Sequence, residues 1–110
     1  NPSRRGIEWD LLPWCREAGV TVMAYSPIEQ GWLLKVEALG AVARALGATP
    51  AQVALAWVLQ QGVAAIPRSA SPDHVRENRG AADLHLPTEA LDALDEAFPP
   101  PSGPTPLEIL

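Results

Sequence analysis

The sequence predicts an α/β fold that forms part of a larger closed barrel of parallel strands. Two short apolar segments, residues 20–25 and 63–66, have the composition of buried strands. Two helical patterns lie between them, and connections of this length bring the chain back so that the strands run parallel. Because two parallel strands alone leave both sheet edges unpaired, the pattern is typical of the last quarter of a barrel.

Composition is that of an ordinary globular protein, with 47% hydrophobic and 19% charged residues among 110. A net charge of −5 argues against non-specific nucleic-acid binding. A single cysteine excludes a disulfide framework and a multi-thiolate zinc site, and predicts a reducing, cytoplasmic location. No apolar run reaches the roughly 20 residues that span a bilayer, so no membrane partner is expected. Because the chain opens with Asn1 instead of Met, we expect that the N-terminal part of a longer protein is missing.

The first helix is predicted for residues 10–18. Asp10 is a suitable N-cap, and Gly19 is typical of the position that follows a helix. The strand of residues 20–25 comes next, and its apolar, β-branched composition predicts burial on both faces. A loop over residues 26–34 follows it.

Two helices are predicted between the strands. Residues 36–46 form an amphipathic pattern that ends at Gly47. Residues 49–52, Thr-Pro-Ala-Gln, combine a threonine cap, a proline at N1 and a glutamine at N3, as in a capping box. The second helix continues to Gln61 and is apolar nearly all the way round, which predicts deep burial.

The rest of the chain contains one strand, two helices and a tail. The second strand covers residues 63–66, and helices are expected over residues 71–79 and 88–98. Residues 99–110 are rich in proline and lack periodicity, which predicts an extended tail. We therefore divide the chain into a barrel portion, residues 1–98, and this tail.

The turn after the second strand is the most informative segment. Arg68 supplies a forked cation, Ser69 and Ser71 supply hydroxyl groups, and a helix begins directly afterwards. Helix N-termini attract anions, and His74 lies one turn further along. In a (β/α)8 barrel, phosphate groups commonly bind after the final strand. The turn is either an anion site or a simple helix cap, with Ser71 capping and Arg68 solvated.

The first strand ends at Tyr25, which the barrel geometry would place at the mouth of the site. Its ring would either stack on an aromatic ligand or form part of the barrel rim. The residues alone leave both interpretations open.

Four motifs follow one another along the chain. They are residues 23–28 (Met-Ala-Tyr-Ser-Pro-Ile), 49–57 (Thr-Pro-Ala-Gln-Val-Ala-Leu-Ala-Trp), 66–69 (Ile-Pro-Arg-Ser) and 77–78 (Glu-Asn). In this order and spacing, the chain up to about Phe98 resembles the C-terminal portion of the bacterial-type aldo-keto reductases. The resemblance implies a (β/α)8 barrel that binds NADP(H) in an extended pose.

The resemblance also implies a role for each matching residue. Tyr25 would stack on the nicotinamide ring, and Ser26 and Ile28 would lie near the pyrophosphate. Other residues would hold the adenosine half, with the 2′-phosphate at Arg68, Ser69 and Ser71 and adenine at Glu77 and Asn78. His74 stands where many members carry an arginine, which predicts a weaker hold on the 2′-phosphate.

The family's catalytic Asp, Tyr, Lys and His have no counterpart in this chain, so no catalytic residue is assigned to it. The sequence thus predicts the cofactor-binding portion of an NADP(H)-dependent reductase of small carbonyl substrates, inactive by itself. Two alternatives remain: a non-enzymatic nucleotide- or phosphate-binding module that self-associates through its open sheet, and a degenerate truncated product.

Overall fold

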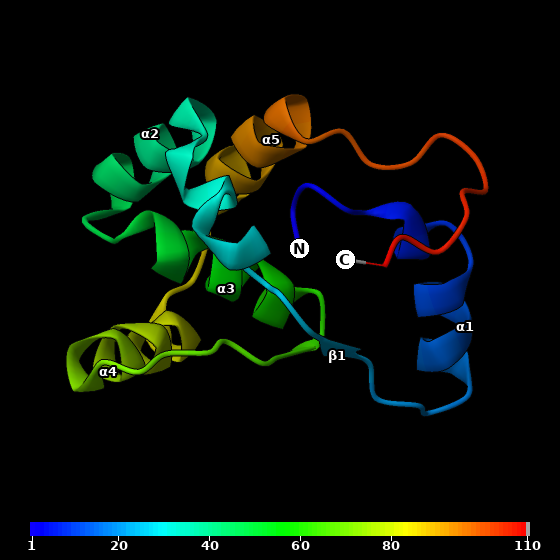
Figure 1. Ribbon diagram of the computed structural model, residues 1–110. Coiled ribbons are helices and arrows are strands. Elements are labelled where there is room, and N and C mark those ends of the chain that lie inside the picture. The colour runs from blue at the N-terminus through cyan, green and yellow to red at the C-terminus, as the bar shows by residue number, and fades with distance from the viewer. Residues whose placement is uncertain (110) are drawn as a thin grey trace.

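A computed structural model describes residues 1–109 and shows a small parallel sheet with helices around it (Figure 1). The strands are β1 (Met23–Ala24) and β2 (Ala64–Ala65). They run parallel, with the Cα atoms of Met23 and Ala64 paired. The amide of Ala64 donates to the carbonyl oxygen of Val22 at 2.9 Å, and that of Ile66 donates to Ala24 at 3.1 Å. The prediction of an α/β fold with two parallel strands is confirmed.

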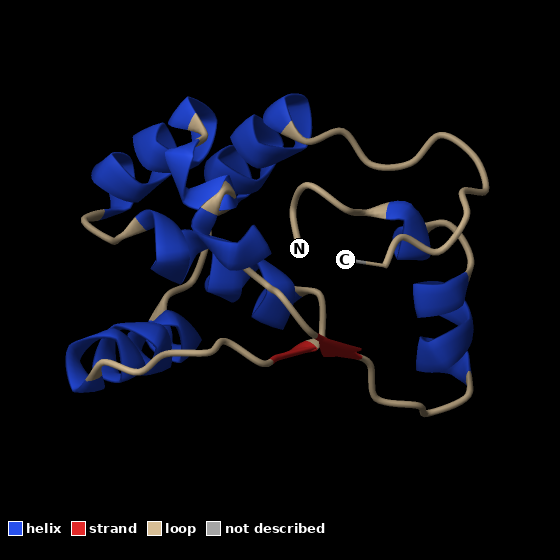
Figure 2. Cartoon of the chain, viewed as in Figure 1, coloured by secondary structure: helices blue, strands red, loops and turns tan. Residues whose placement is uncertain are grey.

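Helices make up most of the described chain (Figure 2). The α-helices are α1 (Leu11–Glu17), α2 (Glu37–Leu46), α3 (Pro50–Gln60), α4 (Pro72–Gly80) and α5 (Thr88–Ala97). Short 3-10 helices are η1 (Gly6–Glu8), η2 (Glu29–Gly31), η3 (Leu33–Lys35) and η4 (Ala81–Asp83). The predicted order of helices and strands is confirmed, although η2 and η3 occupy the segment expected to be a loop.

Local sequence signals set several helix ends as predicted. The side chain of Asp10 accepts a hydrogen bond from the amide of Leu11 at the start of α1. Gly47 ends α2 in the left-handed conformation, with φ of 62°, which favours glycine. At α3 the capping box is complete: the Gln52 amide donates to Thr49 Oγ1 at 3.2 Å, and the Thr49 amide donates to Gln52 Oε1 at 3.1 Å. These ends are encoded by neighbouring residues alone.

Most of the hydrophobic core lies between helices, and Ala24 of β1 and Ala65 of β2 pack against its edge. Leu39 of α2, Val53 of α3 and Leu94 of α5 are each at most 1% exposed and belong to one cluster. In Figure 1, α2, α3 and α5 stand together on one side of β1, with α1 on the other. Within residues 1–109 no single helix is long and apolar enough to cross a membrane; α2 and α3 meet that test only as a pair bent by 89°.

The two strands are more exposed than predicted. Val20, Met23, Tyr25 and Ile66 are 49%, 65%, 51% and 51% exposed, so the expectation of burial on both faces was wrong. Within residues 1–109 the sheet has only two strands, and each therefore has one unpaired edge. The composition of these segments suits strands that have a neighbouring strand on each side. In this sheet each strand has a neighbour on one side only.

Arg5 joins three distant parts of the chain. Its side chain is 8% exposed, and its guanidinium pairs with Glu8 at 2.8 Å and Asp95 at 2.6 Å. It also donates to the carbonyl oxygen of Phe98 at 2.6 Å and lies 5.0 Å from the ring centre of Trp57. Burial alone lowers the pKa of Arg5, but the hydrogen bonds to the two carboxylates outweigh it and raise that pKa. Arg5 thus fastens the N-terminal segment to α3 and α5.

Residues 99–109 contain no helix or strand and run back along the N-terminal segment (Figure 1). Arg4 and Glu108 lie 3.5 Å apart there. The boundary between a barrel portion and a tail after residue 98 stays a prediction.

Candidate functional site

A hollow lies where α4 faces the start of α3 and the loop after β1. Residues Ile28, Leu34, Ala51, Arg68, Ser69, His74, Glu77 and Asn78 line it. Six of the nine residues predicted to bind the cofactor meet here: Ile28, Arg68, Ser69, His74, Glu77 and Asn78. Its volume of about 100 Å³ equals a few water molecules, so the hollow has room for only part of a large ligand.

The turn before α4 is shaped by Ser69. Its Oγ accepts a hydrogen bond from the Ser71 amide at 3.1 Å and lies 3.2 Å from the Ser71 carbonyl oxygen. Ser71 occupies the N-cap position, but its side chain makes no capping hydrogen bond, and Pro72 follows it. The interpretation of Ser71 as a side-chain cap is therefore wrong. The Ser71 side chain therefore leaves the first amides of α4 uncapped. Uncapped amides at a helix N-terminus attract anions.

Arg68 supplies the positive charge of the hollow, and the His74 ring beside it can donate a hydrogen bond. Both side chains are exposed, and among residues 1–109 Arg68 makes no ion pair. Arg76 instead pairs with Asp73 at 2.9 Å on the solvent side of α4 and does not line the hollow. Arg68 therefore keeps its forked donors available for an anionic ligand.

Glu77 ties α4 to the start of α3. The hydroxyl of Thr49 donates to Glu77 Oε1 at 2.5 Å, and Gln52 Nε2 donates to the Glu77 carbonyl oxygen at 3.1 Å. The same Thr49 oxygen accepts the capping bond of α3, so one residue serves two helices. A Cβ at Gly80 would lie 2.8 Å from Gln52 Nε2, so a side chain there would displace Gln52 from the Glu77 carbonyl oxygen. Sequence reasoning found the capping box but not its link to Glu77, because the link joins residues 28 apart.

The loop after β1 has an unusual backbone. Ser26, Glu29 and Gln30 adopt left-handed conformations, with φ of 46°, 50° and 54°. Such conformations cost a non-glycine residue about 1 kcal/mol or more, and they persist where surrounding contacts hold them. Ile28 of this loop reaches the hollow. Sequence analysis missed this conformation, since glycine appears in the loop only at Gly31.

Three predicted residues lie outside the hollow: Tyr25, Ser26 and Ser71. Tyr25 is half exposed and lines a neighbouring cavity together with Asn1, Arg4 and Leu107. Ser26 follows it directly and is held through its carbonyl oxygen by Asn1. The loop after β1 thus connects two hollows, one at Tyr25 and one at Arg68. The contacts that each residue would make with a cofactor stay predictions.

Comparison with known proteins decides the family. The model of the aldo/keto reductase family matches residues 1–98. The chain belongs to the aldo/keto reductase family. This confirms the resemblance seen in its motifs.

Several relatives of this aldo/keto reductase chain are informative. It is 44% identical to methylglyoxal reductase YeaE of Escherichia coli, over 96% of this chain and 39% of that protein. It is 36% identical to glyoxal reductase of Bacillus subtilis, over 92% of this chain and 37% of that protein. The crystal structure of a Klebsiella pneumoniae aldo-keto reductase in complex with NADPH aligns with a TM-score of 0.94 and 43% identity, covering 99% of this chain and 40% of that one.

The chain spans about 40% of the length of these relatives. Because its fold aligns with a segment of the solved reductases, the prediction that it is part of a (β/α)8 barrel is confirmed.

Proposed function

We propose that this aldo/keto reductase chain is the cofactor-binding portion of an NADP(H)-dependent enzyme that transfers a hydride between nicotinamide and a small carbonyl or alcohol. One observation carries the proposal: residues predicted to bind the adenosine half converge on one hollow at the start of α4. The Klebsiella pneumoniae relative, 43% identical, is a complex with NADPH. Arg68 in the hollow suits a phosphate of such a dinucleotide, because its guanidinium is cationic and exposed.

The 2′-phosphate would be held by Arg68 and by the first amides of α4. A guanidinium binds phosphate through paired hydrogen bonds, and the helix dipole adds partial positive charge. Ser69 would hold the turn in shape, because its hydroxyl is already hydrogen-bonded to Ser71. His74 would contribute a weaker donor than an arginine in its place.

The adenine ring would lie against Glu77 and Asn78, which are half-buried beside the phosphate position. The remainder of the dinucleotide would cross the loop after β1, passing Ile28 and Ser26 to reach Tyr25. When bound, the nicotinamide supplies the hydride, and this chain's residues orient it.

We propose that the chain alone does not reduce carbonyls. Its single tyrosine, Tyr25, is assigned to the cofactor, and its single lysine, Lys35, is exposed at the end of η3. Proton transfer to a carbonyl oxygen needs an acid within hydrogen-bond reach of it. Carbonyl-dependent oxidation of NADPH by the purified chain would contradict this proposal.

Calorimetric titration of the 110-residue chain with NADPH and NADH tests the binding role. Replacing Arg68 with Ala should weaken NADPH binding about 10- to 100-fold, the value of hydrogen bonds to a charged group, and change NADH binding little. Arg44→Ala is the matched control, because Arg44 is an exposed arginine on α2. Absence of NADPH binding, or equal losses for both dinucleotides, would refute the assignment.

A second function is supported by the exposed sheet: a nucleotide-binding module built from two or more copies. Within residues 1–109 no strand covers the outer edge of β1, and Met23 and Tyr25 stand exposed beside it. Unpaired edges of this kind favour pairing with another chain. Sedimentation velocity distinguishes the two, because this function requires a defined oligomer that binds NADPH without reducing carbonyls.

We also propose a reducing, cytoplasmic location, supported by a single cysteine, Cys15, which is buried on α1. Cell fractionation is the direct test. Recovery of the chain from an oxidising compartment would contradict this proposal.

A further inference from the structure

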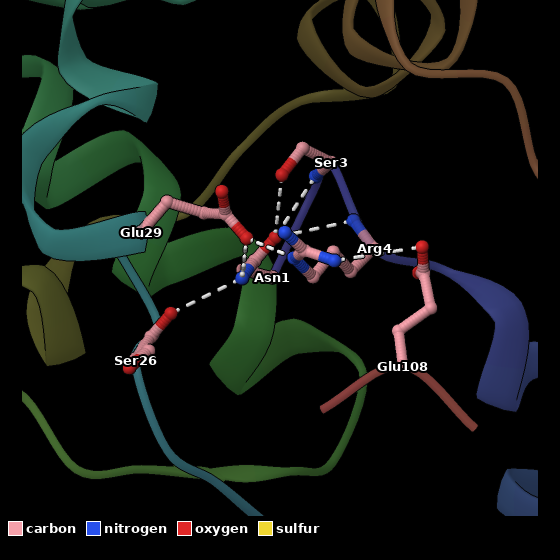
Figure 3. A network of polar contacts seen from close by, with 6 residues as sticks. All are labelled: Asn1, Ser3, Arg4, Ser26, Glu29 and Glu108. Carbon is pink, nitrogen blue, oxygen red and sulfur yellow. Dashed lines mark hydrogen bonds and ion pairs between the residues drawn. The ribbon is translucent and has the colours of Figure 1, made fainter. Parts of the chain in front are cut away.

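A polar network joins the first residues of the chain to the loop after β1 (Figure 3). The side-chain oxygen of Asn1 accepts hydrogen bonds from the amides of Ser3 and Arg4, both at 3.1 Å. The Asn1 amide nitrogen donates to the carbonyl oxygen of Ser26 at 3.1 Å and to Glu29 Oε1 at 3.3 Å. The Asn1 side chain therefore bridges two segments: its oxygen bonds to the N-terminal turn, and its nitrogen bonds to the loop after β1.

Glu29 is the centre of this network. Arg4 Nε donates to Glu29 Oε1, the same oxygen that Asn1 contacts. The Glu29 side chain is only 10% exposed, whereas that of Arg4 is 34% exposed. A carboxylate so deeply buried requires a compensating charge and hydrogen bonds. Arg4 and Asn1 supply both.

The network is attached to strained backbone. Glu29 and Gln30 are left-handed, and so is Ser26, whose carbonyl oxygen Asn1 holds. Inside the loop, the Glu29 amide donates to the Ser26 carbonyl oxygen at 3.1 Å, and the Gly31 amide donates to Ile28 at 2.9 Å. Without anchors, residues of this kind relax to ordinary conformations, since the left-handed region is unfavourable for side chains with a Cβ.

We propose that Asn1, Arg4 and Glu29 are positioning residues that hold the loop after β1 in its ligand-binding shape. The inference rests on the proposed function, because the loop carries Ser26 and Ile28, which are assigned to the pyrophosphate. Ile28 lies in the hollow of Arg68, while Ser26 adjoins Tyr25. Relaxation of the loop would therefore weaken binding of the pyrophosphate and nicotinamide half more than binding of the 2′-phosphate, which Arg68 and the start of α4 hold.

Hydrogen exchange in the full 110-residue chain tests the positioning without any cofactor. In Arg4→Gln and Glu29→Gln, the amides of Glu29 and Gly31 should exchange about tenfold faster, while amides of α3 keep their rates. Arg4→Lys keeps the charge and should recover most of the protection. Arg44→Gln, which breaks the exposed pair with Glu37, is the matched control and should leave the loop unchanged.

Binding provides the second readout, with NADPH and adenosine 2′-monophosphate as probes, because the monophosphate lacks the pyrophosphate that the loop is proposed to hold. Arg4→Gln and Glu29→Gln should weaken NADPH about tenfold and the monophosphate less than twofold. Equal losses for both probes, faster exchange throughout α3, or loop exchange equal to that of Arg44→Gln would overturn the proposal. If the unmodified chain binds neither probe, the proposed function fails, and the exchange rates alone then decide whether the network positions the loop.

Discussion

Replacing Arg5 with Met should lower the free energy of unfolding by about 3 kcal/mol, which is a large effect for a residue near the N-terminus. Methionine has a similar length and no charge, so the change removes the ion pairs while largely filling the space. The Glu8 carboxylate and the carbonyl oxygen of Phe98 would then lose the guanidinium that binds them in this partly buried position.

The magnitude follows from the exposure of each partner. Glu8 is 17% exposed, and its charged hydrogen bonds contribute about 1.5–3 kcal/mol. Asp95 is 46% exposed, so solvent screening keeps its pair below about 1 kcal/mol. The Phe98 carbonyl adds about 1 kcal/mol and the Trp57 ring about 0.5–1 kcal/mol. Burial of the methionine returns about 1 kcal/mol.

Urea unfolding followed by far-ultraviolet circular dichroism measures the loss. The control is Arg44→Met, which removes an arginine whose pair with Glu37 is exposed (67% and 82%) and should cost below about 0.5 kcal/mol. Arg5→Lys, which keeps the charge without the forked donors, should fall between them. Equal urea midpoints for Arg5→Met and Arg44→Met would refute the assignment of Arg5 as a structural anchor.

Three further changes have defined outcomes. Thr49→Val removes both the α3 cap and the bond to Glu77 and should cost about 1–3 kcal/mol in urea unfolding; a loss no larger than that of Thr88→Val would contradict the shared role. Gln30→Gly should stabilise the chain by about 1 kcal/mol, because glycine adopts φ of 54° without strain; a lower urea midpoint would contradict this. Burial lowers the pKa of the Asn1 α-amino group below 8.0, against an opposing attraction from Glu29. Between the lowered value and 8.0 the unfolded chain binds more protons, so the free energy of unfolding should rise with pH, and N-terminal acetylation should abolish that rise.

Features encoded by adjacent residues were predictable from the sequence. The Asp10 cap, the left-handed Gly47 and the Thr49–Gln52 capping box each depend on contacts within a few positions. Strand location was also predictable, because apolar, β-branched segments are rare outside strands and buried helices. Strand burial was not, since it depends on neighbours that the sheet of this chain does not contain.

Six of the residues that line the hollow were selected from the sequence, but their contacts with one another were not predicted. The turn at Arg68 was identified because a forked cation and serines precede a helix start, and it lies at the hollow. The engagement of Ser69 with Ser71, and that of Glu77 with Thr49, depend on side-chain directions that spacing does not fix. The pattern of two adjacent arginines favours a solvated pair, and this interpretation is wrong for Arg5, because its partners Asp95 and Phe98 are about 90 positions away.

The side chains of Arg4 and Glu108, which lie near the two ends of the described chain, form an ion pair at 3.5 Å, and Figure 1 shows the two end segments running beside each other. A short Gly-Ser linker would join these segments, and the exposed turn at Gly19 offers a place for new ends. A circularly permuted chain opened there would keep its packed helices while α1 became the last element to leave the ribosome. We expect such a permuted chain to reach the same arrangement of helices and strands although its segments are synthesised in a different order.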